Sequence, residues 1–217
     1  MSTVYNCAVP ESRAAGLAAA AGAVRSGQLV VLPTDTVYGL GCDAFSVTAV
    51  RGLLDAKGRG RDMPVPVLVG SWSTVDGLVL GAPPAEAHRL IEAFWPGGLS
   101  IVLPQAPSLA WDLGDTRGTV MLRMPLHPVA LELLREVGPM AVSSANRSGQ
   151  SPATTVDQAR DQLGERVPVL LDGGPAGAAV PSTIVDLTGD DPLVLREGAV
   201  SAAEIGEVLG CTVSIAS

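Results

Sequence analysis

The feature of the sequence that most constrains the fold is a short apolar run at 29–32, which ends at Pro33 and gives way to polar residues. An uninterrupted run of Leu and Val predicts a strand that is buried on both faces. Apolar residues make up 47% of the chain, enough to cover such a strand. Because aromatic residues contribute only 3%, we expect a core of Val, Leu, Ile and Ala. The run therefore predicts a sheet flanked by helices.

Helical and strand patterns alternate along all 217 residues. We expect helices at 11–26 (with Ser12 as N-cap), 46–56, 84–94, 127–137, 155–163 and 202–209. Besides 29–32, we expect strands at 64–69, 99–103, 119–123, 139–143, 167–171, 184–187 and 193–196. Because no repeat or linker interrupts this alternation, the pattern favours one α/β domain over 1–217 with a twisted, mixed sheet.

Charge and cysteine usage exclude several classes of protein. The formal net charge of −8 argues against a broad nucleic-acid-binding surface, which would be basic. The three cysteines are widely spaced and form no CxxC pair, which argues against a disulfide framework or a zinc site and favours a reducing cytoplasm. No apolar run approaches the roughly 20 residues that a membrane-spanning helix needs.

A cluster of cations, Lys57, Arg59 and Arg61, is separated by single glycines. In a glycine loop these side chains can converge on a polyanion while the backbone comes close to it. A solvated basic turn explains the same pattern equally well. The segment is not a phosphate-binding P-loop, and no dinucleotide-binding glycine fingerprint follows a predicted strand.

Two other polar segments follow predicted strands. Thr34 to Tyr38 supplies three hydroxyls and a carboxylate, which can orient a small polar ligand or merely satisfy their own turn. Ser143 to Asn146 offers hydroxyls, an amide and backbone N–H groups, and it is either a close approach to a nucleotide or a capped turn.

Two arginines, Arg123 and Arg196, end predicted apolar strands. A buried arginine is costly unless an anion pairs with it, and that anion is either a ligand or a structural carboxylate. The pair Ser182 and Thr183 is most simply the entry to a strand. The histidines have no metal-ligand spacing, and no G-x-S-x-G elbow is present. The polar residues suit the binding of phosphates and a carboxylate more than an acid–base pair.

These pieces occur together, in order, in one known family. The chain resembles the YrdC-like family, the threonylcarbamoyl-AMP synthases, in its short, single-domain form, with a motif-bearing core at about 15–205. The resemblance is carried by P-T-D-T-V-Y-G-L-G (33–41), K-G-R (57–59), F-W-P-G-G-L-S-I-V-L (94–103), L-R-M-P-L-H-P-V-A (122–130), S-S-A-N-R-S-G (143–149), L-D-G-G-P (171–175), P-S-T-I-V-D (181–186) and L-R-E-G-A-V (195–200).

The resemblance implies a twisted α/β sheet with a concave, positively lined cavity. It implies an enzyme that makes L-threonylcarbamoyl-adenylate from L-threonine, bicarbonate and ATP, with release of pyrophosphate. Mg²⁺ would bind through the phosphates, and no protein residue is implied as a metal ligand. The product would pass to a tRNA threonylcarbamoyl transferase complex for modification of adenosine 37, with at most a weak contact between this chain and tRNA.

Carried over by position, the resemblance places threonine near Thr36, Arg123, Ser143 and Ser182. It places ATP near Lys57, Arg59, Met63, Thr119, Ala145, Asn146, Ala153 and Arg196. Lys57 and Arg59 would neutralise the triphosphate as catalytic residues, and Arg123 would hold the threonine carboxylate as a bidentate pair.

The chain departs from the family pattern at Met63 and Leu68, where many relatives carry Asn and His, and at Pro181, where a glutamate is common. Arg61 is a candidate to replace the missing polar contacts. Two other functions remain open: an RNA-binding module without synthase activity, and a related carbamoyl-transfer enzyme.

Overall fold

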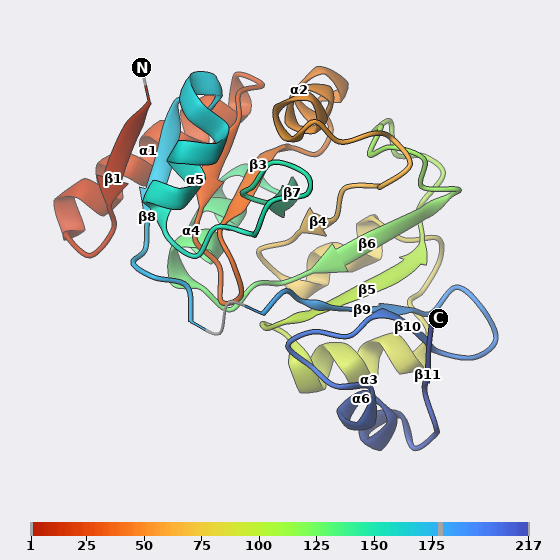
Figure 1. The fold of residues 1–217 in the computed structure, drawn as a ribbon. Coiled ribbons are helices and arrows are strands. Elements are labelled where there is room, and N and C mark those ends of the chain that lie inside the picture. Colours follow the sequence, from red (N-terminus) through yellow and green to blue (C-terminus); the bar gives the residue numbers. More distant parts are fainter. Residues whose placement is uncertain (1, 178–179, 217) are drawn as a thin grey trace.

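The structure, a computed structural model, describes residues 2–177 and 180–216. Its centre is one 11-stranded sheet (Figure 1). In spatial order the strands are β1 (Thr3–Asn6), β8 (Val169–Asp172), β2 (Val30–Leu32), β3 (Gly39–Asp43), β7 (Met140–Ser144), β4 (Val67–Leu68), β6 (Thr119–Arg123), β5 (Leu99–Pro104), β9 (Thr183–Asp186), β10 (Leu193–Arg196) and β11 (Ser214–Ile215).

The sheet mixes parallel and antiparallel pairs, as predicted. β2 is antiparallel to β3 and parallel to β8, and β5 is antiparallel to β6 and parallel to β9. Six α-helices and two 3₁₀ helices are seen in the described residues: α1 (Pro10–Arg25), α2 (Val47–Lys57), η1 (Trp72–Gly77), α3 (Ala85–Phe94), α4 (Pro128–Val137), α5 (Val156–Leu163), η2 (Gly164–Arg166) and α6 (Ala202–Leu209).

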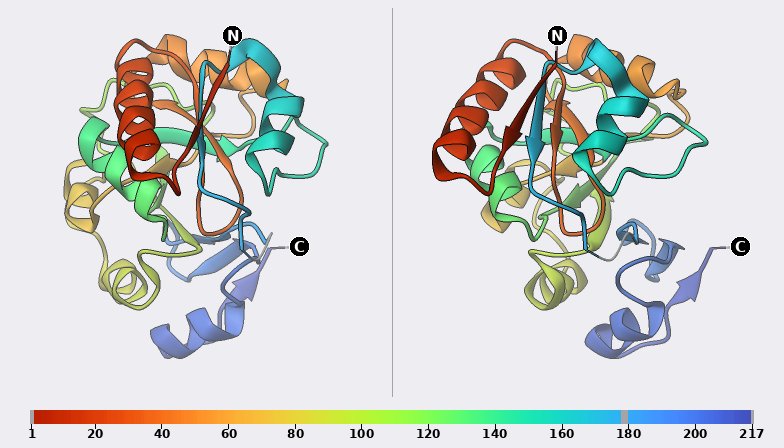
Figure 2. Two further views of the ribbon diagram at one scale, coloured as in Figure 1. Left: turned by 90° about the vertical axis from the view of Figure 1, so that its left-hand side faces the viewer. Right: turned by 60° about the vertical axis from the view of Figure 1, so that its left-hand side comes forward.

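The helices cover the sheet on both faces, and β2 shows why they must. Val30 and Leu32 belong to an apolar cluster with α1 and α4, whereas Val31 between them belongs to the cluster on the opposite face. Figure 2 shows α1 on one side of the strands and α5 on the other. Figure 1 shows α3 and α6 together beside β5 and β9. The predicted burial of β2 on both faces is confirmed.

Some predicted details are wrong. Ser12 is not the N-cap of α1, because Pro10 at the first helical position moves the start to Val9, which makes no side-chain cap. The strand expected at 64–69 is only Val67–Leu68. β1, β3 and β11 lie outside the predicted strands. No helix in the part of the chain that the structure describes is long and apolar enough to cross a membrane.

β3 escapes a pattern-based prediction because two of its residues are glycines. A Cβ atom at Gly39 would lie 2.6 Å from Cγ1 of Val142, and one at Gly41 would lie 2.9 Å from the terminal carbon of Met140. The strand therefore needs glycine to pair closely with β7, although glycine normally weakens a strand. The segment 33–38 is accordingly the connection of a hairpin that joins β2 to β3.

Candidate functional site

The β2–β3 connection closes on itself and also presents a hydroxyl. Thr34 Oγ1 donates to the carbonyl of Val37 at 2.6 Å and accepts from the backbone N–H of Thr36 at 3.2 Å. The side chain of Thr36, which is buried, meets Nη1 of Arg123 at 3.0 Å. The interpretation that Thr34 satisfies its own turn is confirmed, and that turn places Thr36 beside an arginine. The binding of a ligand by this segment stays a prediction.

Arg123, at the end of β6, is buried and has an internal carboxylate. Its Nη2 donates to Asp35 at 2.7 Å, and its Nε donates to the carbonyl of Gly97 at 2.8 Å. Burial lowers the pKa of Arg123, and the charge of Asp35 opposes that effect. Since a guanidinium has five N–H groups, one on each terminal nitrogen remains without a partner in the described residues.

Arg59 and Arg196 differ from Arg123, because neither forms an ion pair within residues 2–177 and 180–216. Arg59 donates from Nη1 to Ser143 Oγ at 3.1 Å, and its Nε is buried with no hydrogen-bond partner among the residues that the structure describes. Arg196 donates to the carbonyl of Ser182 at 3.1 Å from Nε and at 2.7 Å from Nη2. Both side chains thus bring positive charge with no carboxylate within ion-pair distance among the described residues.

The electrostatics of these two arginines favour an anion. Burial lowers the pKa of Arg59, the charge of Arg196 lowers it further, and Asp62 raises it in part. Burial also lowers the pKa of Arg196. By solvent accessibility Arg59 is partly buried and Arg196 is exposed. Two guanidinium groups that repel each other are stabilised when a negatively charged ligand lies between or beside them.

A pair of serine hydroxyls lies next to Arg196. Ser100 on β5 and Ser182 at the entry to β9 are both buried, and their Oγ atoms are 3.0 Å apart. Ser182 Oγ also accepts from Nη2 of Arg196 at 3.3 Å. Ser100 was not among the predicted site residues, although a serine inside the apolar strand 99–103 is the kind of signal that could have marked it.

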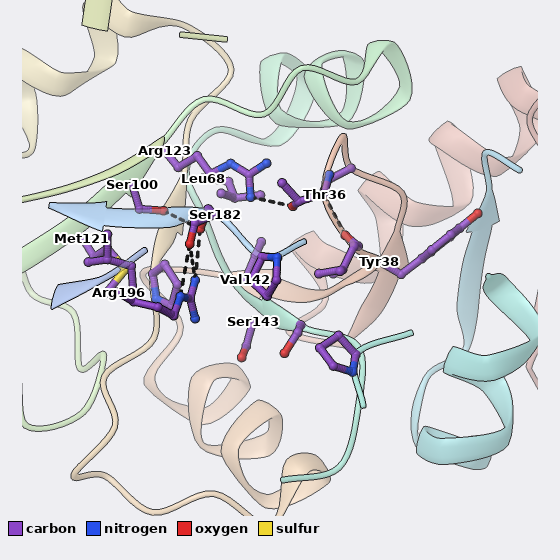
Figure 3. A pocket seen from close by; sticks show the side chains of 18 of the residues that line it. Thr36, Tyr38, Leu68, Ser100, Met121, Arg123, Val142, Ser143, Ser182 and Arg196 are labelled. Carbon is purple, nitrogen blue, oxygen red and sulfur yellow. Dashed lines mark hydrogen bonds between the residues drawn. The ribbon is translucent and has the colours of Figure 1, made fainter. Parts of the chain in front are cut away.

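These side chains line one cavity of about 170 Å³. Figure 3 shows Thr36, Arg123, Ser182 and Arg196 around it, with Tyr38 directing its ring away. Six predicted site residues line the cavity: Thr36, Arg59, Arg123, Ser143, Ser182 and Arg196. Lining residues that the prediction omitted include Thr34, Ser100, Met121, Val142, Ser144, Pro152 and Ile184.

All four predicted threonine positions line the cavity, but only two of the eight ATP positions do. Lys57, Met63, Thr119, Ala145, Asn146 and Ala153 lie outside its lining. Ala145 and Ala153 form backbone hydrogen bonds with Tyr38. The N–H of Ala145 donates to the carbonyl of Tyr38, and the N–H of Tyr38 donates to the carbonyl of Ala153. Thr119 Oγ1 donates to the carbonyl of Thr116 at 2.7 Å.

The two departures from the family pattern have different surroundings. Leu68 lines the cavity, so an apolar side chain forms this part of its wall. Met63 is 45% exposed and lies outside the cavity lining. The idea that Arg61 replaces a missing polar contact is wrong, because Arg61 forms a two-point ion pair with Asp112, at 2.8 Å for each bond, outside the cavity lining. Within the described residues, no group of three or more His, Cys, Asp or Glu could hold a metal ion.

Comparison with known proteins identifies relatives of this chain. A family model, Sua5/YciO/YrdC, described as "Telomere recombination", matches residues 22–198. A protein of Mycobacterium tuberculosis strain H37Rv is 64% identical over 210 residues, covering 97% of this chain and 96% of that protein. The Bacillus subtilis protein named threonylcarbamoyl-AMP synthase is 40% identical over 197 residues, covering 89% of this chain and 56% of its own length.

Two solved structures agree with the fold. The crystal structure of Pyrococcus abyssi Sua5 complexed with L-threonine superposes with a TM-score of 0.91 at 34% identity, over 100% of this chain and 62% of that chain. Escherichia coli YciO superposes with a TM-score of 0.83 at 26% identity, over 94% of this chain and 100% of that chain. The chain belongs to the Sua5/YciO/YrdC family.

Proposed function

We propose that the protein is a threonylcarbamoyl-AMP synthase, which joins L-threonine, bicarbonate and ATP and releases pyrophosphate and water. The observation that carries the proposal is the pair Arg59 and Arg196, two cations that form no ion pair with any described residue and line one cavity. The other polar side chains in the lining are Arg123 and hydroxyls. Such a cavity suits a substrate carboxylate and phosphates together. Relatives named for this activity, and the threonine complex of P. abyssi Sua5, support it.

In this proposal threonine occupies the part of the cavity beside Thr36, Arg123, Ser143 and Ser182. Arg123 holds the threonine carboxylate through its two remaining N–H groups, since Asp35, Thr36 and Gly97 take the other three. That arrangement fixes the carboxylate at two points, as guanidinium groups commonly do. The buried hydroxyls of Thr36 and Ser182 then supply hydrogen bonds to the remaining polar groups of the amino acid.

The nucleotide phosphates lie against Arg59 and Arg196. The threonine amine attacks the carbon of bicarbonate, and loss of water gives a carbamate. A carbamate oxygen then attacks the α-phosphorus of ATP, and the bond to the β-phosphate oxygen breaks as pyrophosphate leaves. Charge neutralisation and alignment supply most of the catalysis in such a transfer, so the cavity needs no acid–base pair.

Further parts of the proposal concern Mg²⁺ and tRNA. Mg²⁺ enters with ATP and stays on its phosphates as part of the substrate. The mixed anhydride that forms is an activated carbamoyl donor, and we place its consumption in a transferase that modifies adenosine 37 of tRNA. Direct contact between this chain and tRNA is at most weak, because the net charge is −8.

The test is release of pyrophosphate from ATP in the presence of bicarbonate and a panel of amino acids. We expect release that depends on both bicarbonate and threonine, with serine and valine as poorer substrates because each lacks one group of threonine. Pyrophosphate release that does not depend on threonine would favour a related carbamoyl-transfer enzyme. No release, together with salt-sensitive binding of tRNA, would favour an RNA-binding module, and either result would overturn the proposal.

A further inference from the structure

The chain contains one lysine among 14 cationic side chains, and that lysine is Lys57. The other 13 are arginines, so lysine occurs only where α2 ends. Lys57 is also buried, with 3% of its surface exposed, whereas lysine is among the side chains that are least often buried. A residue type that the chain uses once, in a setting that disfavours it, calls for a reason in the local geometry.

The geometry around the Lys57 ammonium accounts for all three of its N–H groups. Nζ lies 2.5 Å from the carbonyl oxygen of Ser144, 2.7 Å from the carbonyl oxygen of Asn146 and 3.1 Å from Oδ1 of Asn146. An ammonium has three donors and no acceptor, so this arrangement leaves none for a ligand. Lys57 also lies outside the cavity lining, unlike Arg59 two residues later.

The segment that receives these bonds is the loop after β7, which we call the 144–150 loop. Asn146 donates from Nδ2 to the carbonyls of Arg147 at 3.0 Å and Gln150 at 2.7 Å, which orients its Oδ1 toward Lys57. The N–H of Ser148 donates to the backbone carbonyl of Lys57 at 2.8 Å. The end of α2 therefore holds this loop through its side chain and its main chain together.

The 144–150 loop is directly connected to the cavity, because its first residue, Ser144, also lines the cavity. Ser143 and Ser144 line the cavity, and the Ser144 carbonyl is one of the three acceptors of Lys57. Ser143 is in turn the partner of Arg59. Movement of the loop would displace both the hydroxyl of Ser143 and the guanidinium that it orients.

We propose that Lys57 is a positioning residue: its ammonium fixes the 144–150 loop, and thereby Ser143 and Arg59, without contacting the triphosphate. Lysine suits this role because three divergent N–H bonds leave one compact nitrogen, whereas the planar fork of arginine cannot reach three oxygens clustered in this way. The role of the loop in catalysis rests on the proposed function, but the contacts that hold the loop do not.

The proposal is tested first without ligand, by hydrogen exchange in the 144–150 loop. We compare the wild-type protein with Lys57→Met, which keeps the length of the stem, and with Arg61→Met as a matched control on the same segment but outside the cavity lining. Loss of hydrogen bonds to a charged group should accelerate exchange in the loop of Lys57→Met about tenfold or more. Arg61→Met should leave the loop unchanged. Equal protection in all three proteins would overturn the proposal.

The second measurement needs no variant, because a protein with one lysine, labelled with ¹⁵N-lysine, gives one side-chain ammonium signal. We expect that signal to be observable, since bonded N–H protons exchange slowly, and to stay in place when a non-hydrolysable ATP analogue is added. A large shift on addition of the analogue would show contact with phosphate and overturn the proposal. If the wild type binds no analogue by calorimetry, the proposed function fails, while the exchange result still decides the role of Lys57.

Discussion

Two arginines only two positions apart have opposite surroundings. Arg61 is exposed and faces Asp112 and Asp115, whereas Arg59 lines the cavity and has no carboxylate within ion-pair distance in the described residues. Exposed ion pairs contribute little, typically about 0–1 kcal/mol, because water and salt screen them. Of the two, only the charge of Arg59 is placed to act on a bound anion.

We therefore expect Arg59→Met to weaken binding of an ATP analogue about 10-fold to 100-fold. This follows from the loss of a charged hydrogen bond, about 1.5–3 kcal/mol at roughly 1.4 kcal/mol for each tenfold change. Arg61→Met should bind within about twofold of wild type, because it removes only an exposed pair. Calorimetric titration of both variants checks this, and equal effects in the two would contradict the assignment of Arg59.

The pH dependence of Lys57 provides a second prediction. Burial, reinforced by the charge of Arg59, lowers the pKa of Lys57 to about 8 from the ordinary 10.5. The 144–150 loop opposite supplies carbonyl and amide oxygens to the ammonium, with no carboxylate among its bonded partners. As pH rises through 8, the ammonium loses a proton and with it a donor to the loop.

The ratio of kcat/KM between wild type and Lys57→Met should fall toward one between pH 7 and pH 10. Titration of threonine and bicarbonate cancels in the ratio, because both proteins use the same substrates. The free energy of unfolding should rise with pH over the same range. The pKa of Lys57 is lower in the folded protein than in the unfolded chain, so the unfolded chain binds more protons between the two pKa values. A ratio that does not change with pH would remove Lys57 from catalysis.

The orientation of the Lys57, Arg59 and Arg61 side chains could not be predicted from the sequence. The pattern K-G-R-G-R identified three cations separated by single glycines and left open whether they bind an anion or form a solvated basic turn, and the family resemblance assigned only Lys57 and Arg59 to the triphosphate. The structure instead gives the three side chains three roles: a loop contact, a cavity lining and a surface ion pair. Only Arg59 has glycines on both sides, and Lys57 is the last residue of α2. The direction of each cation depends on acceptors up to 89 residues away, which spacing alone does not reveal.

Among the elements, the β2–β3 hairpin is tied to the turn that follows β8. The hydroxyl of Tyr38, a fully buried residue, donates to the carbonyl of Gly174 at 2.6 Å and accepts from the N–H of Gly173 at 3.1 Å. Burial raises the pKa of Tyr38, so the hydroxyl stays neutral and keeps its proton to donate. One hydroxyl thus joins two loops that are 134 or more residues apart.

Tyr38→Phe should lower the free energy of unfolding by about 1–3 kcal/mol, because it leaves a donor and an acceptor at the Gly173–Gly174 turn without their partner. Tyr5, the only other tyrosine, is the matched control. Within the part of the chain that the structure describes, its hydroxyl makes no hydrogen bond, so Tyr5→Phe should change stability by less than about 0.5 kcal/mol. Denaturation in urea measures both, and equal losses in the two variants would refute the role of the hydroxyl.

Strands and helices that bury apolar side chains could be predicted from the sequence, whereas strands with few buried apolar side chains were missed. β2 was predicted from its uninterrupted apolar run, and β6 and α6 from the apolar residues that they contain. β3 was missed because its glycines carry no apolar signal, and β11 because its two residues are exposed. Pairing with a neighbouring strand, rather than local preference, creates these elements.

In the whole molecule, the cavity forms only when distant parts of the sheet meet. Thr36 follows β2, Arg123 ends β6, Ser143 lies in β7, Ser182 precedes β9, and Arg196 ends β10. Spacing alone could identify each segment as polar and left open whether any of them bound a ligand. Resemblance to a family supplied the grouping, and the structure places six of the twelve predicted positions on one cavity.

This arrangement predicts that the chain unfolds in a single transition and that bound ligands raise the temperature of that transition, as expected for a single domain over 1–217. A ligand that binds only the folded state adds about 2.7 kcal/mol at 100 times its Kd. For a chain of this size that corresponds to a rise in Tm of about 5–10 °C, in one transition, because the lining strands span the sheet from β2 to β10. Calorimetric melting with threonine and an ATP analogue checks this. Arg196→Ala should melt near the wild-type temperature without ligand, since among the described residues its side chain bonds only to Ser182. The same variant should gain little stability from the analogue. Two separate transitions, with only one shifted by ligand, would show that the strands from β9 onward unfold independently and that the cavity does not join them to the rest.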